Sequence, residues 1–225
     1  IMRKSIGVGL LGLGTVGGGV VEVLATKADS LAEQAGLRLI LKKVLVRDVK
    51  KRRPTKVSPT LLTSRPEEVL SHPEVDVVIE LIGGEQPSTK YIKQALANGK
   101  HVVTANKEVI AKVGYEILDL ARENKVYFLF EASVASGIPI IGALSNSLTS
   151  YNLKEIMGIL NGTTNYILTK MSEEGKDYEE ALKEAQEKGY AEADPSKDID
   201  GFDAFNKIFI LSAIAFRVKI DPNNI

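Results

Sequence analysis

Short apolar runs alternate with segments of helical spacing over the first 130 residues of the chain. The runs are rich in Val, Ile and Leu, as buried strands are, and the segments between them have the 3.6-residue period of helices. The predicted strands are residues 5–11, 37–46, 75–82, 101–104 and 126–131. The predicted helices are residues 16–27, 88–98 and 114–124. Strands alternating with helices are typical of an α/β fold with a doubly wound, mostly parallel sheet.

The pattern changes after residue 132, where we place a domain boundary. Residues 1–132 form the first predicted domain, and residues 133–225 form a second of α+β type. Its predicted elements are a helix at 138–148, a strand at 151–160, a polar turn at 161–165 leading into a helix, an exposed helix at 178–188 and a strongly apolar helix at 202–216.

Composition excludes several classes of function. Lys plus Arg equals Asp plus Glu at 29 each, so the net charge is zero and we expect no nucleic-acid partner. No stretch approaches the roughly 18 apolar residues of a membrane span, and glycines interrupt the apolar N-terminal run that imitates a signal peptide. The chain has no cysteine, which excludes thiolate chemistry and agrees with a cytoplasmic location.

A glycine-rich loop follows the first predicted strand and precedes the first predicted helix. Glycines at these spacings allow a tight turn, close approach of a pyrophosphate to the backbone, and close packing of helix on strand. The helix N-terminus adds unpaired N–H groups and a partial positive charge. We therefore expect a Rossmann-type dinucleotide site; the alternative is a glycine-rich turn without a ligand. The motif is Gly12-Leu13-Gly14-Thr15-Val16-Gly17.

The end of the second predicted strand bears on the choice between NADP and NAD. Arg47 can stack on adenine and pair with a 2′-phosphate, and the cations at 50–53, which include Arg53, add to the positive field. An acidic residue here suits NAD, so Asp48 keeps NAD open. The sequence favours NADP; the alternative is a solvated charge run.

A second polar cluster lies at 189–201, immediately before the apolar helix. That helix carries Asp203 and Lys207 four residues apart, so both project from one face. A charged pair on a mostly apolar helix is costly unless it faces a polar cleft. Acids that hold an ammonium group and a lysine that moves a proton would form a site for an amino-acid alcohol or aldehyde.

Taken together, these motifs resemble the homoserine dehydrogenase family over essentially the whole chain and in the right order. Beside the glycine loop, they are ELIGG at 80–84, VTANK at 103–107, EASVASGIPII at 131–141, GILNGTTNYIL at 158–168 and GYAEADP at 189–195. By the family's pattern the catalytic portion continues past the equivalent of Ile225, so we expect the sequence to end before that portion is complete.

The resemblance implies NAD(P)-dependent interconversion of L-homoserine and L-aspartate 4-semialdehyde, on the route from aspartate to threonine, methionine and isoleucine. It implies that Lys207 is the acid/base and that Lys107 lies beside the nicotinamide and the reacting oxygen. It also implies that Glu192 and Asp203 hold the polar ends of the substrate, with Asp198 supporting the site.

Further expectations follow from the same resemblance. Additional cofactor contacts fall in the family motifs, at Gly83, Thr104, Lys107 and Gly189. A sodium ion would be held at the turn after the fifth strand, where the alternative is a bare structural hinge; the ligands would be Glu131, Val134, Ser136 and Ile138. The family forms dimers through its second domain, so we expect a homodimer with the segment at 151–160 as candidate interface.

Two other functions remain open from the sequence. One is a different nicotinamide-dependent amino-acid dehydrogenase on the same nucleotide domain; a semialdehyde dehydrogenase is excluded, because it needs a thiolate. The other is a module that binds a nucleotide without turnover. Loss of turnover with retained cofactor affinity on replacing Lys207 would separate a catalyst from such a module.

Overall fold

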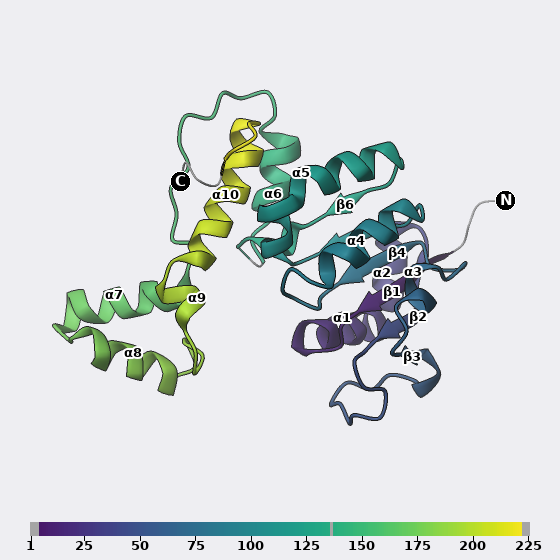
Figure 1. Cartoon of the computed structure of the whole chain (residues 1–225), viewed down its shortest axis with the longest axis horizontal. Helices are drawn as coiled ribbons and strands as arrows, with labels where there is room; N and C mark the ends of the chain where they lie inside the picture. Colours follow the sequence, from purple (N-terminus) through teal and green to yellow (C-terminus); the bar gives the residue numbers. More distant parts are fainter. Residues whose placement is uncertain (1–4, 136, 222–225) are drawn as a thin grey trace. The chain divides into compact units, whose positions relative to one another are not determined.

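The structure, a computed structural model, describes residues 5–135 and 137–221 (Figure 1). The chain divides into two compact units, one up to Ser133 and the other from Val134 on. The boundary predicted at residue 132 lies next to this division. None of the described helices is long and apolar enough to cross a membrane.

The first unit is built on one six-stranded sheet in which every pair of neighbouring strands is parallel. The strand order is β3-β2-β1-β4-β5-β6, which is the order of Rossmann-type dinucleotide-binding folds. The predicted doubly wound parallel sheet is confirmed. The strands are β1 (Ser5–Leu11), β2 (Arg38–Leu45), β3 (Leu62–Thr63), β4 (Val77–Glu80), β5 (His101–Thr104) and β6 (Phe128–Leu129).

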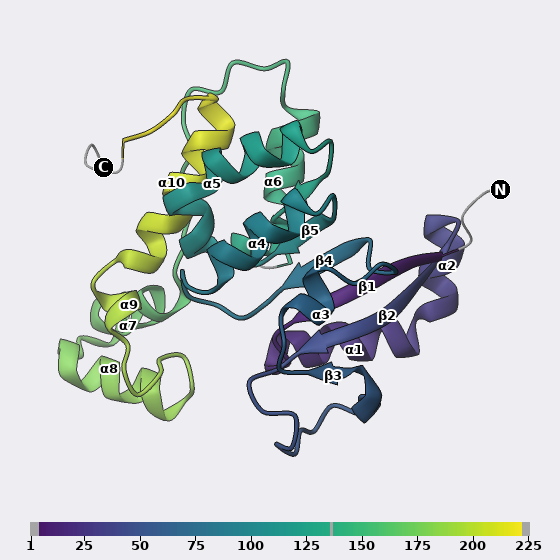
Figure 2. The ribbon, with the colours of Figure 1, turned by 45° about the vertical axis from the view of Figure 1, so that its right-hand side comes forward.

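The central strands are apolar because both faces of the sheet are covered. Leu10, Val44, Val78 and Val102 are fully buried, one from each of four neighbouring strands. Figure 2 shows β2, β1 and β4 side by side. Gly7 is required in β1, because a Cβ there would lie 1.6 Å from the carbonyl oxygen of Glu74.

Helices cover the sheet between the strands. α1 and α2 pack against β2, and α4 packs against β4 and β5. The helices of this unit are α1 (Thr15–Thr26), α2 (Ala28–Ala35), α3 (Glu67–Leu70), α4 (Ser88–Ala97) and α5 (Lys107–Glu123), with 3₁₀ turns η1 (Pro59–Leu61) and η2 (Glu131–Ser133). Four elements were not predicted from the sequence, and all lie between the first and third predicted strands: α2, η1, β3 and α3.

α5 begins at Lys107, well before the predicted start at Gly114. The Asn106 side chain caps it by accepting a hydrogen bond from the Val109 backbone N–H. The backbone leaves helical geometry at Val113, where φ is −132°. The glycine therefore lies beside a kink within one helix and does not mark the start of another.

All regular secondary structure among the described residues of the second unit is helical. Its elements are α6 (Ile140–Gly142) with a π-helical turn η3 (Ala143–Ser147), α7 (Gly162–Glu174), α8 (Tyr178–Glu187), α9 (Ser196–Ile199) and α10 (Phe202–Phe216). The predicted bounds of the apolar helix are confirmed. The predicted polar turn at 161–165 is instead the cap and first turn of α7.

The predicted strand at 151–160 is wrong for this structure. The segment has no strand assignment, and Tyr151, Met157 and Ile159 are 66%, 82% and 76% exposed. A strand needs a hydrogen-bonded neighbour, and no described residue of this unit forms a strand that could pair with it. The segment has the apolar alternation of a strand, but it does not pair with a described strand.

α7 and α8 form an antiparallel pair with its own small core, and they lie side by side in both views (Figures 1 and 2). Ile167 from α7 packs with Ala181 and Ala185 from α8. The rings of Tyr166 and Tyr190 stack with centroids 4.5 Å apart. Small residues on α8 let the two helices approach closely.

Glu184 is the charged centre of this pair. It forms ion pairs with Lys176 and Lys188 and accepts a 2.8 Å hydrogen bond from the Tyr166 hydroxyl. The hydrogen bond from Lys176, followed by those from Lys188 and Tyr166, lowers the pKa of the Glu184 carboxyl to about 2. The same contacts raise the pKa values of Lys176 and Lys188 above their ordinary range.

We predict that these contacts make the second unit sensitive to acid. A carboxyl with a lowered folded-state pKa stabilises the fold above its ordinary value of 4.5, and that contribution disappears as the pH falls toward about 2. Urea unfolding followed by circular dichroism between pH 5 and pH 2 should show a smaller decline in Glu184→Gln. Glu187→Gln, on the same helix, is the matched control and should decline as the wild type does; equal slopes for all three would contradict the prediction.

Candidate functional site

The carboxyl ends of β1 and β4 meet at one edge of the sheet. The two strands are neighbours, and the order of the strands reverses between them. In open parallel sheets, ligands bind in the crevice outside the strand ends at such a switch point. The loop after β1 lies there.

The three motif glycines of this loop differ in what an added side chain would meet. Gly12 has φ of +98°, and a Cβ there would lie 2.7 Å from the Leu81 carbonyl oxygen. A Cβ on Gly17 would lie 2.2 Å from the Gly12 carbonyl oxygen, so this glycine lets α1 pack on the loop. A Cβ on Gly14 would meet nothing within 4 Å, although Gly14 lines a cavity. Gly12 and Gly17 thus serve the fold, and Gly14 leaves space beside the loop.

The N-terminus of α1 faces this space without a side-chain cap. Gly14 is the N-cap residue, and there is no acidic residue in the first turn. The first N–H groups of a helix have no partner within the helix and carry a partial positive charge. The helix end is therefore suited to a phosphate group.

The cavity at the loop has a volume of about 1200 Å³. Its walls combine the glycine loop, the end of β2 and the basic segment that follows, with Leu81 and Ile82 from the end of β4; the basic residues are Arg47, Lys51, Arg52, Arg53 and Lys56. This volume and charge suit an anionic dinucleotide.

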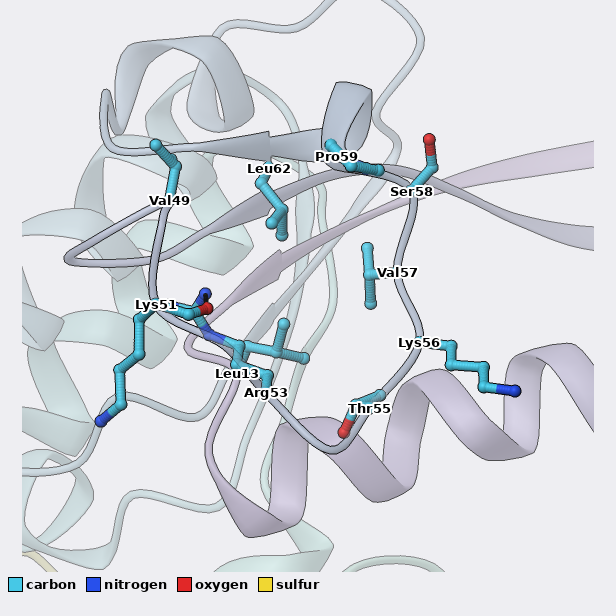
Figure 3. A pocket seen from close by; sticks show the side chains of 10 residues that line it. All are labelled: Leu13, Val49, Lys51, Arg53, Thr55, Lys56, Val57, Ser58, Pro59 and Leu62. Carbon is cyan, nitrogen blue, oxygen red and sulfur yellow. Dashed lines mark hydrogen bonds between the residues drawn. The ribbon is translucent and has the colours of Figure 1, made fainter.

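A second hollow of about 550 Å³ shares part of the basic segment. Leu13, Val57 and Leu62 form its apolar wall, while Lys51 and Lys56 extend away from it (Figure 3). An apolar wall beside basic side chains could take the flat ring of a base. We regard it as an extension of the site at the glycine loop.

The two predicted arginines differ in their surroundings. Arg53 donates to the carbonyl oxygens of Asp48 at 2.6 Å and Lys51 at 2.8 Å, so its guanidinium holds the loop in shape. Arg47 is exposed and lines the larger cavity. Arg47 is therefore the better placed of the two for a phosphate, and Arg53 acts at least partly through the loop.

A buried acid, Glu80, links the ends of β4 and β5. Glu80 is 0% exposed, and its Oε1 accepts from the Ile82 backbone N–H at 2.8 Å. Its Oε2 accepts from the Thr104 hydroxyl at 2.7 Å. That hydroxyl in turn accepts from the Asn106 backbone N–H at 3.0 Å. The Thr104 side chain, predicted to contact the cofactor, is thus occupied on both sides by protein groups.

Asn106 extends this network to the next loop and to α5. Its Nδ2 donates to the Gly84 carbonyl oxygen at 2.7 Å, while its Oδ1 caps α5. Lys107 consequently stands in the first turn of α5, and Gly83 lies in the loop that Asn106 holds. Glu80 and Asn106 were not predicted as site residues. An acid at the end of a buried strand and an asparagine before a helix were the available signals.

The polar cluster of the second unit is centred on the first turns of α10. The Asp203 side chain is only 9% exposed, and its Oδ2 lies 2.6 Å from Lys207 Nζ. Lys207 Nζ also donates to the Leu160 carbonyl oxygen at 2.6 Å. The predicted pair is therefore formed, and it is largely shielded from water.

Asp198, on α9, joins the same cluster through two residues of the N-G-T-T-N segment. Asn161 Nδ2 donates to Asp198 Oδ1 at 2.7 Å and to Asp203 Oδ2 at 2.9 Å. The Thr163 hydroxyl lies 3.0 Å from Asp198 Oδ2 and 2.6 Å from the Tyr190 carbonyl oxygen. Asn161 and Thr163 were not predicted as site residues, because their segment has the composition of a polar turn.

Two other predicted residues lie outside this hydrogen-bonded cluster. Glu192 is exposed, and its carboxylate has no hydrogen bond or ion pair with a described residue. Gly189, with φ of +78°, turns the chain after α8. The structure therefore brings Asp198, Asp203 and Lys207 together and leaves Glu192 open to solvent.

The predicted sodium ligands fall on both sides of the division between the two units. Glu131 belongs to the first unit and Val134 and Ile138 to the second, while Ser136 lies outside the described residues. Ala135 between them has a positive φ of 59°. The sodium site stays a prediction. Within residues 5–135 and 137–221, no group of three or more His, Asp or Glu side chains is arranged to hold a metal ion.

Comparison with known proteins agrees with both units. The family model for the homoserine dehydrogenase NAD-binding domain matches residues 12–131, more than half of the chain. The model for homoserine dehydrogenase itself matches residues 139–225. The chain belongs to the homoserine dehydrogenase family.

Individual homoserine dehydrogenases are similar over nearly the whole chain. The Bacillus subtilis enzyme is 49% identical over 222 residues, which are 99% of this chain and 51% of that protein. The Thiobacillus denitrificans structure superposes with a TM-score of 0.91 at 48% identity, covering 98% of this chain and 51% of that one. A hyperthermophilic archaeal homoserine dehydrogenase in complex with NADPH has a TM-score of 0.81 at 31% identity, covering 94% and 70%. The chain spans about half the length of the curated relatives it matches.

We predict that Gly14→Ala weakens NADPH binding without unfolding the nucleotide domain. The added methyl group meets no protein atom within 4 Å, but it occupies the space beside the helix N-terminus. Crowding of this kind costs about 1–3 kcal/mol, or roughly a ten- to hundredfold loss of affinity. NADPH fluorescence titration and thermal unfolding would measure both effects.

Gly17→Ala is the matched comparison, because its methyl group overlaps the Gly12 carbonyl oxygen. It should lower both the melting temperature and the affinity. Wild-type affinity in Gly14→Ala would show that the phosphate lies elsewhere.

Proposed function

We propose that this chain provides the nucleotide-binding and acid/base parts of an enzyme that interconverts L-homoserine and L-aspartate 4-semialdehyde with NADP or NAD. The supporting observation is the environment of Lys207. An ammonium group has three N–H donors, and Asp203 and the Leu160 carbonyl take two of them. The third has no partner among the described residues and is available to a substrate oxygen.

The proposed chemistry divides between the cofactor and the chain. A bound nicotinamide would accept or supply the hydride at the substrate carbon. In the reduction of the semialdehyde, Lys207 Nζ donates a proton to the carbonyl oxygen. In the oxidation of homoserine, the neutral amine form of Lys207 accepts the hydroxyl proton and becomes the ammonium form. Proton transfer of this kind typically contributes 10²–10⁴-fold to the rate.

The acids of the second unit have separate proposed roles. Asp203 orients Lys207, and Asp198 is occupied by Asn161 and Thr163. The Glu192 carboxylate has no partner among the described residues, and its oxygens suit the ammonium group of an amino-acid substrate. Lys107, in the first turn of α5, is proposed to lie beside the nicotinamide and the reacting oxygen.

Finer features of the proposal rest mainly on the family resemblance. We propose a preference for NADP, supported by exposed Arg47 at the cavity wall. We also propose a sodium ion at the turn after β6, a cytoplasmic location, and a homodimer through the segment at 151–160. The exposed apolar side chains of that segment support the interface.

We predict that the protein reduces NADP or NAD when L-homoserine is added, which increases the nicotinamide absorbance. Lys207→Ala should lower the rate of this increase about 100-fold or more, while the affinity for NADPH is kept. Lys170→Ala is the control, because Lys170 also pairs with an acid four residues away on a helix, Glu174. The assay uses this chain and a chimera in which the remaining part of the Bacillus subtilis relative follows Ile225. L-Aspartate in parallel tests for another amino-acid dehydrogenase.

Three results would separate the possible functions. Loss of turnover in Lys207→Ala alone supports the proposed catalyst. NADPH binding with no turnover by either form indicates a nucleotide-binding module. Turnover of L-aspartate in place of L-homoserine indicates the other dehydrogenase.

We predict that Arg47→Ala lowers the ratio of NADP-dependent to NAD-dependent rates. A hydrogen bond to a charged group is worth about 1.5–3 kcal/mol, so the ratio should fall roughly ten- to hundredfold. Arg122→Ala, which removes an exposed arginine paired with Asp119, is the control. An unchanged ratio would mean that the basic segment is only a solvated charge run.

A further inference from the structure

We infer that Asn161 is a positioning residue that holds the Lys207 ammonium group and the carboxylates of Asp198 and Asp203 in one arrangement. The inference deepens the proposed function, on which its catalytic consequence rests. Asn161 is 6% exposed and stands at the N-cap of α7. Its side chain contacts Asp198 on α9 and Asp203 on α10, so it joins α7 to both helices.

Every hydrogen-bonding position of the Asn161 amide is used. Oδ1 accepts from both the Thr164 backbone N–H and the Thr164 hydroxyl at 2.8 Å. Nδ2 donates one hydrogen to Asp198 at 2.7 Å and the other to Asp203 at 2.9 Å. A primary amide offers two acceptor lone pairs and two donors, so no capacity is left over. Hydrogen bonds therefore hold the side chain at both its amide oxygen and its amide nitrogen.

Capping of α7 does not by itself require asparagine. Asp177 caps α8 through the same type of bond, from the Glu180 backbone N–H at 2.8 Å. Serine and aspartate cap helices about as well as asparagine does. At position 161, however, two carboxylates face the cap. Aspartate would add a third negative group, and serine has only one hydrogen to donate. The amide donors are therefore the property that this place demands.

Lys207 depends on Asn161 through two routes. Its Nζ donates to Asp203 Oδ2, the same oxygen that Asn161 Nδ2 holds. Its other partner is the carbonyl oxygen of Leu160, the residue that precedes Asn161 in the chain. Both anchors of the ammonium group thus move if the cap moves. The direction of the third N–H, which the proposed reaction uses, is set by these two anchors.

The experiment compares Asn161→Asp and Asn161→Ser with Asp177→Ser. Both variants at 161 keep a capping oxygen, while Asp177→Ser makes a similar exchange at a cap that touches no acid cluster. We expect kcat in the variants at 161 to fall roughly 10- to 100-fold, with KM changed less than about threefold. Asp177→Ser should keep wild-type kcat and KM.

A readout without turnover accompanies the kinetics. In ¹⁵N-lysine-labelled protein, the Lys207 ammonium group should give a slowly exchanging signal, assigned by its loss in Lys207→Arg. We expect Asn161→Asp to lose this signal and Asp177→Ser to keep it. Circular dichroism checks that the helices remain formed in each variant.

The outcomes decide the inference separately from the proposed function. A retained ammonium signal in Asn161→Asp overturns the inference, because Asn161 then acts only as a cap. Loss of the signal with unchanged kcat also overturns the inference, because the position held by Asn161 would then not matter for catalysis. If wild-type protein has no turnover of L-homoserine, the proposed function fails, and the ammonium signal alone decides whether Asn161 positions Lys207.

Discussion

The carboxylate of Glu80 has to find all its hydrogen-bond donors inside the protein, because no part of it reaches water. It finds them at the end of its own strand and in the Thr104 hydroxyl at the end of the next. The ends of β4 and β5 are thereby tied together at the edge where β1 enters its glycine loop. Lys107 and the nucleotide cavity occupy positions that follow from this bond. A shift of Glu80 would change the loop after β4 and the start of α5 together.

The second unit satisfies its buried acid by the same means. Asp203 is shielded on α10, and Lys207 and Asn161 are among its donors. Each unit also has an asparagine that caps a helix near the buried acid: Asn106 caps α5 and Asn161 caps α7. The oxygen of each amide holds the helix, and its NH₂ group reaches another segment. Asn106 thus fixes a helix end and the loop at Gly84, and Asn161 fixes a helix end and two acids, so stability and site geometry are not independent here.

Much of the fold followed from periodicity, whereas much of the site depends on contacts between distant residues. The bounds of β5 and α10 were predictable because apolar spacing and terminal residues agree there. The segment at 151–160 has the same alternation as a strand, but pairing requires a second strand that local sequence does not reveal. Asp203 and Lys207 were found because their spacing places them on one face. Asn161 was missed because its partners lie 37 and 42 residues away.

Net charge was the least informative property of the chain, since a sum of zero hides two opposite local fields. The first unit places Arg47 and its basic neighbours around an open helix N-terminus, where phosphate groups are stabilised. The second unit places Asp198 and Asp203 near Lys207, and Asp203 stabilises the ammonium group of that lysine. An anionic dinucleotide and the proposed amino-acid substrate require environments of opposite charge. The separation of charge between the units is therefore the electrostatic condition for binding both, and composition averaged over the chain cannot reveal it.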